Sequence, residues 1–170
     1  MASIYDTELD KNAANYAPLT PLSFLERAAS VFPDKTAVIH GEYRCDYAEL
    51  YRRCRRLASA LRRRGIGVGD TVSVMAPNVP ALLEAHYGVL MAGAVLNAIN
   101  IRLDPPSIAF ILSHCGAKLL ISDAEFSEGV GQALEGMSDP PAVVDVDDPL
   151  RDSAKGGRLL GDIDYEAFLE

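Results

Sequence analysis

Short apolar runs alternate with helical stretches along most of the chain, and this alternation restricts the fold more than any other feature. The strand-like runs are Thr71 to Met75, Ala94 to Ile99, Lys118 to Ile121 and Ala142 to Val146. Repeated strand–helix units imply a parallel, twisted sheet with right-handed crossovers. Strands that are apolar on both faces are expected where helices cover both sides of the sheet. The predicted fold class is therefore α/β, with a parallel twisted sheet and flanking helices.

Helix-start and helix-stop residues place three helices between and after these strands. Asn78 is the expected N-cap of a helix that extends to about Met91. Asp104-Pro105 opens a second helix, which ends near Cys115 before Gly116, and residues 124–134 form the third.

The region before the sheet is expected to hold an arm, a short helix and a β-hairpin. Residues 1–17 are polar and lack periodicity, which indicates an N-terminal arm. Thr20 is the expected N-cap of a helix that begins with Pro21-Leu22 and ends near Phe32. Residues 36–39 and 43–45 are expected to pair as a small hairpin around the His40-Gly41-Glu42 turn.

The strongest helical pattern covers residues 47–64. Asp46 and Glu49 form a capping-box-like pair at its start. An apolar stripe at helical spacing follows, made of Leu50, Cys54, Leu57 and Leu61. The arginines at positions 52, 53, 55, 56, 62, 63 and 64 are interpreted as a solvated face. Gly65, Gly67 and Gly69 follow a helix and precede a strand, so they predict a connector and not a phosphate loop.

The net charge disfavours one class of partner, and the cysteine content indicates a cellular compartment. The net charge is −8, from 24 acidic and 16 basic residues, which disfavours nucleic acid as a partner. Residues 85–101 carry no charge, but Gly88, Gly93 and two asparagines favour a buried helix and strand over a membrane span. The three cysteines show no metal or redox spacing, which fits a reducing, cytoplasmic compartment.

No segment carries a recognisable catalytic motif. His40, His86 and His114 are scattered, and the sequence has neither a Gly-x-Ser-x-Gly elbow nor a Gly-x-x-x-x-Gly-Lys-Ser/Thr loop. Residues 147–161 are expected to be a loop, and residues 165–170 to begin a helix without a C-cap. We interpret this ending as a truncation and expect the sheet to be incomplete.

Eight ordered segments resemble one enzyme family. They are Pro21–Ala29, Phe32–Val38, Asp46–Leu50, Gly65–Val72, Ala76–Pro80, Gly88–Asn97, Asn100–Leu103 and Leu119–Asp123. In this order and spacing they resemble the N-terminal part of AMP-forming acyl-CoA synthetases of the adenylating superfamily. Within that family they are most similar to the medium-chain, acyl-activating type, which includes benzoate and butyrate ligases.

The resemblance implies a two-step reaction of the full-length enzyme. A carboxylate attacks the α-phosphate of ATP with the help of Mg²⁺, and the thiol of CoA then displaces AMP. On this view residues 18–170 are a truncated N-terminal part of the ligase domain, whose phosphate loop and catalytic lysine would lie in a missing downstream segment. The implied cofactors are ATP, Mg²⁺ and CoA, and the implied substrate is a carboxylic acid of fatty acid metabolism. No motif within the chain supports these cofactors, and we expect no turnover from it alone.

Arg102 is the one candidate binding residue. It matches an arginine of the family's Asn-x-Arg-Leu pattern that faces CoA phosphate in relatives, and the alternative is a surface arginine paired with a carboxylate. The alternative for the whole chain is a free-standing, flavodoxin-like binding or interaction domain without catalysis.

Overall fold

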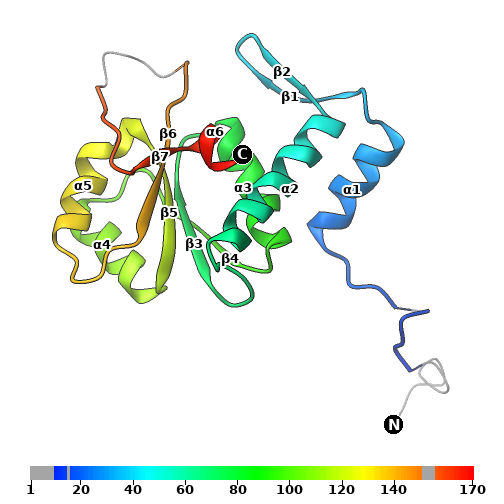
Figure 1. Ribbon diagram of the computed structural model, residues 1–170, viewed down its shortest axis with the longest axis horizontal. Helices are drawn as coiled ribbons and strands as arrows, with labels where there is room; N and C mark the ends of the chain where they lie inside the picture. Colours follow the sequence, from blue (N-terminus) through cyan, green and yellow to red (C-terminus); the bar gives the residue numbers. More distant parts are fainter. Residues whose placement is uncertain (1–9, 15, 151–155) are drawn as a thin grey trace.

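A five-stranded parallel sheet forms the centre of the computed structural model, which describes residues 10–14, 16–150 and 156–170 (Figure 1). The strands lie in the order β4-β3-β5-β6-β7. Their bounds are β3 Thr71–Met75, β4 Val95–Ala98, β5 Ala117–Asp123, β6 Ala142–Val146 and β7 Ile163–Asp164. Val74 lies opposite Ala98 on one side and Ile121 on the other, so β3 is an interior strand. The predicted α/β class with a parallel sheet is confirmed.

Helices cover both faces of this sheet. The helices α2 (Tyr47–Arg63), α3 (Pro80–Met91) and α6 (Tyr165–Phe168) lie on one face, and α4 (Pro105–His114) and α5 (Ser127–Glu135) lie on the other (Figure 1). A short 3₁₀ turn, η1 (Ala124–Phe126), precedes α5. The chain passes from β3 outward to β4 and then returns across β3 to β5, which is the winding of an open, doubly wound sheet.

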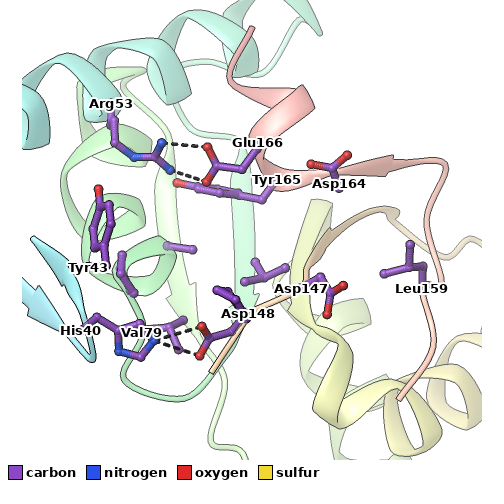
Figure 2. A pocket seen from close by; sticks show the side chains of 14 residues that line it. His40, Tyr43, Arg53, Val79, Asp147, Asp148, Leu159, Asp164, Tyr165 and Glu166 are labelled. Atoms are coloured by element: carbon purple, nitrogen blue, oxygen red, sulfur yellow. Dashed lines mark hydrogen bonds and ion pairs between the residues drawn. The ribbon is translucent and has the colours of Figure 1, made fainter. Parts of the chain in front are cut away.

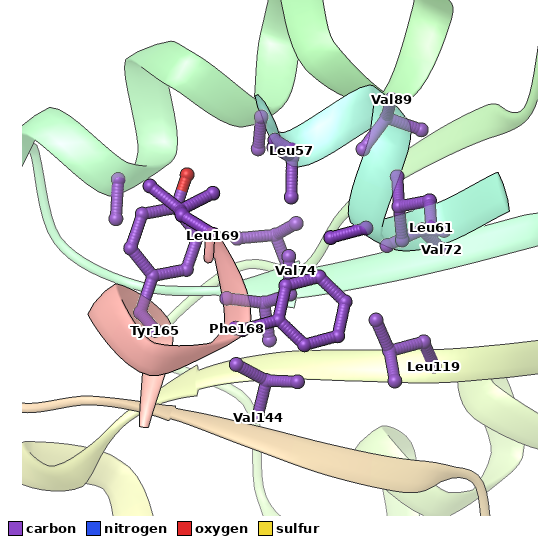
Figure 3. Packing of buried hydrophobic residues seen from close by; sticks show 14 of the residues in the cluster. Leu57, Leu61, Val72, Val74, Val89, Leu119, Val144, Tyr165, Phe168 and Leu169 are labelled. Carbon is purple, nitrogen blue, oxygen red and sulfur yellow. The ribbon is translucent and has the colours of Figure 1, made fainter. Parts of the chain in front are cut away.

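The larger core lies between the sheet and the α2, α3 and α6 helices (Figure 3). Val72 and Val74 contribute from β3, and Phe168 of α6 packs among them and is 1% exposed. A smaller core on the opposite face contains Leu120, since successive strand residues point to opposite faces. The strands are therefore apolar on both faces because helices cover both sides of the sheet, as predicted.

Close contact between α2 and α3 depends on Gly88. A Cβ atom at this position would lie 2.9 Å from the Cys54 carbonyl oxygen and 2.7 Å from Leu57 Cδ2. Real Cβ atoms essentially never approach other atoms this closely, so the glycine sets the distance between the two helices.

The hairpin and α1 form a third layer outside α2. The helix α1 spans Pro21–Val31, and the hairpin strands are β1 (Thr36–His40) and β2 (Tyr43–Asp46). Leu25, Cys45, Leu50 and Cys54 form the core of this layer. Figure 1 shows the hairpin extending beyond the end of α2, on the side of the molecule where the segment after β6 lies. The predicted helix, turn and hairpin are thus confirmed.

Three details differ from the sequence-based expectations. Asn78 does not cap α3; the N-cap position is Val79, because Pro80 holds the first helical position and keeps the preceding residue extended. Thr20 occupies the N-cap position of α1, but its side chain accepts no capping hydrogen bond. The last helix does close: its C-cap is Leu169, whose N–H donates to the Tyr165 carbonyl over 3.2 Å.

Parts of the expected arm and loop lie outside the described residues. In the arm, residues 10–14, 16 and 17 are exposed, while residues 1–9 and 15 are not described. The loop expected at 147–161 is described at 147–150 and 156–161 and has no helix or strand there. Within the described part of the chain, no helix combines the length and the apolar character that crossing a membrane requires.

Candidate functional site

A cavity of about 600 Å³ lies near the carboxyl ends of β3 and β6 (Figure 2). This edge is where open α/β sheets bind their ligands. The hairpin supplies His40 and Tyr43, and the start of α3 supplies Val79 and Pro80. The segment after β6 and the helix α6 complete the wall, with Arg53 of α2 among the lining residues.

A buried charge network forms one side of the cavity and joins three helices. Arg53 Nε donates to Glu84 Oε1 of α3 over 2.7 Å. Its two terminal nitrogens donate to both carboxylate oxygens of Glu166 of α6, over 2.8 and 2.6 Å. The Tyr165 hydroxyl donates to the second oxygen of Glu84 over 2.9 Å. The side chain of Glu84 is 1% exposed and that of Arg53 13%, so the network is almost dry at its inner end.

Burial shapes the titration of this network. Loss of solvent raises the pKa of Glu84, and hydrogen bonding and charge from Arg53 oppose that rise. Loss of solvent also raises the pKa of Tyr165, and the neighbouring Glu84 charge adds to the rise. For Arg53 burial lowers the pKa, but hydrogen bonds to Glu166 and Glu84 more than offset it, so its pKa is raised. Arg53 therefore stays a cation, and it neutralises a carboxylate that would otherwise be isolated.

A second polar contact closes the opposite side of the cavity. His40 Nε2 lies 3.0 Å from both carboxylate oxygens of Asp148. The contact joins β1 to the segment after β6, which are 108 residues apart in the sequence. Figure 2 shows this pair and the Arg53 network on separate parts of the cavity wall.

The chemistry available in the cavity is limited. The described residues that line it include no serine, threonine, cysteine or lysine. No group of three or more His, Cys, Asp or Glu side chains that could hold a metal occurs among the residues the structure describes. His40 is already paired with Asp148, and Arg53 is already paired with Glu166. The arrangement positions structural elements around a cleft and presents no nucleophile beside a base.

Arg102, the candidate residue from the sequence, lies away from this cavity. It sits in the turn after β4, where its backbone N–H donates to Asn100 Oδ1 over 3.0 Å. Its side chain is exposed, and within the described residues it forms no ion pair. The surface pairing with a carboxylate that was the alternative for Arg102 is therefore not observed in that part of the chain.

Cys45, Cys54 and Cys115 are all free thiols. Burial raises the pKa of Cys54 to about 12, and it also raises the pKa of Cys45. Cys115 is partly exposed, and its sulfur lies 3.3 Å from Asn97 Nδ2. Two of the three thiols are thus protonated and inert at neutral pH.

The interpretation of Arg53 as part of a solvated face was wrong. Its position next to the leucine stripe turns it toward α3, where Glu84 holds it. A signal was available, because Glu84 is the only carboxylate in the apolar helix Pro80–Met91. A lone carboxylate in such a helix needs a buried partner. The Glu166 contact, 113 residues away in the sequence, had no local signal.

A layered α/β architecture with a cleft at the carboxyl edge of the sheet is common to many proteins, so the class of this chain comes from comparison with known families. The family model for AMP-binding enzymes matches residues 25–159, and the chain belongs to that family. Acetate–CoA ligase CCL3 of Humulus lupulus is 48% identical over 172 residues and is matched by 96% of this chain. Peroxisomal acetate/butyrate–CoA ligase AAE7 of Arabidopsis thaliana is 45% identical, matched by 95% of the chain. The match in each case spans 30% of the relative's own length.

Solved structures agree with this assignment. Anthranilate CoA ligase AuaEII, in complex with anthranoyl-AMP, has a TM-score of 0.77 over 87% of this chain and 27% of its own, at 21% identity, and supports the fold. A benzoate CoA ligase from Burkholderia xenovorans is 32% identical, with a TM-score of 0.69 over 76% of this chain and 26% of its own. The chain therefore corresponds to the N-terminal part of AMP-forming CoA ligases, and the free-standing flavodoxin-like alternative is not favoured.

Proposed function

We propose that this chain acts as the N-terminal part of an ATP-dependent carboxylate–CoA ligase, which forms an acyl-adenylate and then a CoA thioester. The observation that carries the proposal is the 48% identity to an acetate–CoA ligase, which extends over 96% of the chain. The TM-score of 0.69 to a benzoate CoA ligase that is 32% identical supports it further.

The contribution of this chain is a scaffold and a cleft wall. The cavity at the carboxyl edge of the sheet is held open between the hairpin and α6 by the Arg53 network and by His40 with Asp148. Its lining offers no metal-binding cluster among the described residues, and the sequence has no phosphate loop rich in serine, threonine and glycine. The lining carries four carboxylates against one arginine, which disfavours the polyphosphate of ATP, and we assign no step through ATP or Mg²⁺ to this chain.

A hybrid enzyme tests the proposal. Residues 1–170 would replace the matching N-terminal part of acetate–CoA ligase CCL3, and pyrophosphate release would be measured with ATP, Mg²⁺ and CoA. We expect release that depends on an added carboxylic acid. The controls are the chain alone and the remaining part of CCL3 alone. A soluble, folded hybrid that releases no pyrophosphate with any acid would contradict the proposal.

The substrate is proposed to be a short-chain or aromatic carboxylic acid. Relatives carry the names acetate, acetate/butyrate, trans-cinnamate and benzoate CoA ligase. A panel of these four acids, with a long-chain fatty acid added, distinguishes this class from general fatty acid metabolism in the full-length enzyme.

Arg102 is proposed to contact a phosphate of CoA. Its side chain is exposed and has no ion-pair partner in the described part of the chain, which leaves the guanidinium available to a bidentate anion. In the hybrid, Arg102→Ala should raise the KM for CoA about fivefold, as expected for a loss of about 1 kcal/mol from an exposed charged contact. Arg102→Lys should recover part of the loss, and Lys118→Ala, an exposed cation elsewhere, should change nothing.

The use of dephospho-CoA, which lacks the ribose phosphate, adds a second control. If Arg102 binds that phosphate, Arg102→Ala leaves the KM for dephospho-CoA unchanged. An equal effect of Arg102→Ala on both thiols would place the contact at another part of CoA, and no effect on either would refute it.

The cytoplasm remains the predicted compartment, from the reduced cysteines. Several relatives have names that include the word peroxisomal. Fluorescence microscopy of a tagged full-length protein tests the prediction, and a punctate distribution that coincides with peroxisomes would replace it.

A further inference from the structure

A broad groove runs between α1 and α2. It has a volume of about 750 Å³, and one face of α2 forms one wall while the start of α1 forms the other. Figure 1 shows α1 and α2 side by side, on the side of the molecule opposite α4 and α5. Six of its lining residues define this α1–α2 groove, namely Leu22, Tyr51, Arg55, Ala58, Arg62 and Arg63.

The α2 wall of the groove is strongly basic, although the chain as a whole is acidic. The helix α2 carries six arginines and one carboxylate, whereas the net charge of the chain is −8. Among the described residues, Arg55, Arg62 and Arg63 form no ion pair with a carboxylate. Glu26 is the one carboxylate in the described lining, so three arginines and one glutamate give the groove a net charge of +2.

Two of these guanidinium groups are held in place by uncharged neighbours. Arg55 lies over the Tyr51 ring, with its guanidinium carbon 5.7 Å from the ring centre. Arg63 Nη1 donates to Ser59 Oγ over 3.3 Å. Because neither neighbour supplies a negative charge, both arginines remain available to an anion. Their partial ordering also lowers the entropy cost of binding one.

The spacing of the arginines sets the shape of a suitable partner. Arg55 and Arg62 are seven residues apart, which is about 10 Å along the helix axis. A single phosphate or carboxylate cannot contact both, whereas two acidic side chains two turns apart on a partner helix have the same spacing. The groove also presents an apolar surface, because Leu22, Ala58 and Met91 line it. A matching partner therefore carries apolar side chains between its acidic ones.

We propose that the α1–α2 groove is the docking site for an acidic, amphipathic helix of a partner protein. Such a helix would lay its apolar side chains into the groove and pair its carboxylates with the arginines. A nucleic acid duplex or an anionic membrane fits less well, because either surface would also meet the acidic remainder of the chain. A helix confined to the groove experiences mainly the arginines, since charges beyond about 8 Å are screened at physiological salt. The inference goes beyond the proposed function and does not depend on it.

Fluorescence anisotropy tests the proposal with a labelled helical peptide of about 20 residues, which has glutamates two turns apart and leucines between them. Arg55→Gln and Arg56→Gln form a matched pair, because both arginines are exposed neighbours on α2 and only Arg55 lines the groove. At about 0.15 M salt, Arg55→Gln should raise the Kd about three- to fivefold, and Arg55→Gln with Arg62→Gln about tenfold or more. Arg56→Gln should change the Kd less than about twofold.

Two control peptides separate docking in the groove from simple attraction between charges. One has glutamine in place of each glutamate and tests the arginines, and the other has serine in place of each leucine and tests the apolar surface. Both should bind at least about tenfold more weakly than the original peptide. Circular dichroism shows whether each variant is folded, and the hybrid with CCL3 replaces residues 1–170 if the chain alone is unfolded.

Four results would overturn the proposal. The first is the absence of measurable peptide binding, and the second is an equal effect of Arg55→Gln and Arg56→Gln. The third is Arg55-dependent binding to phosphatidylserine vesicles or duplex DNA that is tighter than peptide binding. The fourth is peptide binding to residues 1–170 that is lost in the hybrid, since this would show that the ligase itself covers the groove.

Discussion

Replacement of Arg53 by methionine should destabilise the chain far more than replacement of its neighbour Arg52. The change leaves Glu84, whose side chain is 1% exposed, without its counter-ion. Removal of one partner of a buried ion pair typically costs about 3–5 kcal/mol. The Tyr165 hydroxyl continues to donate to Glu84, and Glu166 is 69% exposed and can be solvated. We therefore expect a loss of about 2–4 kcal/mol in the free energy of unfolding.

Urea denaturation followed by circular dichroism measures this loss. At a slope of about 2 kcal/mol per molar, the midpoint should fall by about 1–2 M. Arg52 is 62% exposed and pairs with Glu49 within the same helix, so Arg52→Met should cost less than about 0.5 kcal/mol. The double variant Arg53→Met with Glu84→Gln should recover at least about 1 kcal/mol, because the isolated charge is gone.

The pH dependence of the Arg53→Met effect follows from Glu84. Burial raises the pKa of Glu84 above its ordinary value of 4.5, and the loss of Arg53 raises it further. A group with a raised pKa in the folded state contributes less stability as the pH rises through that pKa. The cost of Arg53→Met should therefore be largest near neutral pH and shrink as the pH falls toward 4.5. Equal losses for Arg52→Met and Arg53→Met, or a cost that grows on acidification, would refute this reasoning.

Two other sites give matched tests of packing and hydrogen bonding. Gly88→Ala should cost about 1–3 kcal/mol, because the new methyl group collides with the Cys54 carbonyl oxygen. Gly129→Ala in α5, where a Cβ meets nothing within 4 Å, should instead stabilise by about 0.5–1 kcal/mol. Thermal unfolding of both variants measures these effects, and changes of the same sign would contradict the packing argument. Asp145, 1% exposed, accepts from the N–H groups of Leu160 and Gly161, so Asp145→Ala should cost about 2–4 kcal/mol in urea and Asp145→Asn about half of that. Equal losses for the two Asp145 variants would argue against these hydrogen bonds.

Four of the five strands of the sheet and its main helix could be predicted because their signals are local, whereas the two-residue strand β7 was missed. The runs Thr71–Met75 and Ala142–Val146 have the same bounds in the structure as in the sequence-based prediction. The stripe of Leu50, Cys54, Leu57 and Leu61 is buried, with each residue at most 4% exposed. A continuous apolar run decides the strands and an apolar stripe at helical spacing decides the helix, and each pattern can be read within a short window.

The site was much less accessible from the sequence, because its contacts join distant segments. The partner of His40 is Asp148, and one partner of Arg53 is Glu166. Nothing in the windows around these residues indicates such pairings, since a charged side chain beside an apolar stripe is usually solvated. Arg102 was chosen from a resemblance, and it lies exposed in the turn after β4, away from the cavity.

The distance along the chain between Glu84 and Glu166 has a consequence for synthesis on the ribosome. Both carboxylates share Arg53, but at 5–20 residues per second the later one is made about 4–16 s after the earlier one. During that interval the nascent chain already contains Arg53 and Glu84, and these two can neutralise each other when α2 and α3 pack. When α6 is made, it therefore meets an Arg53–Glu84 pair that can already be in place. The Glu166 contact forms late, because it joins residues that are far apart in the sequence.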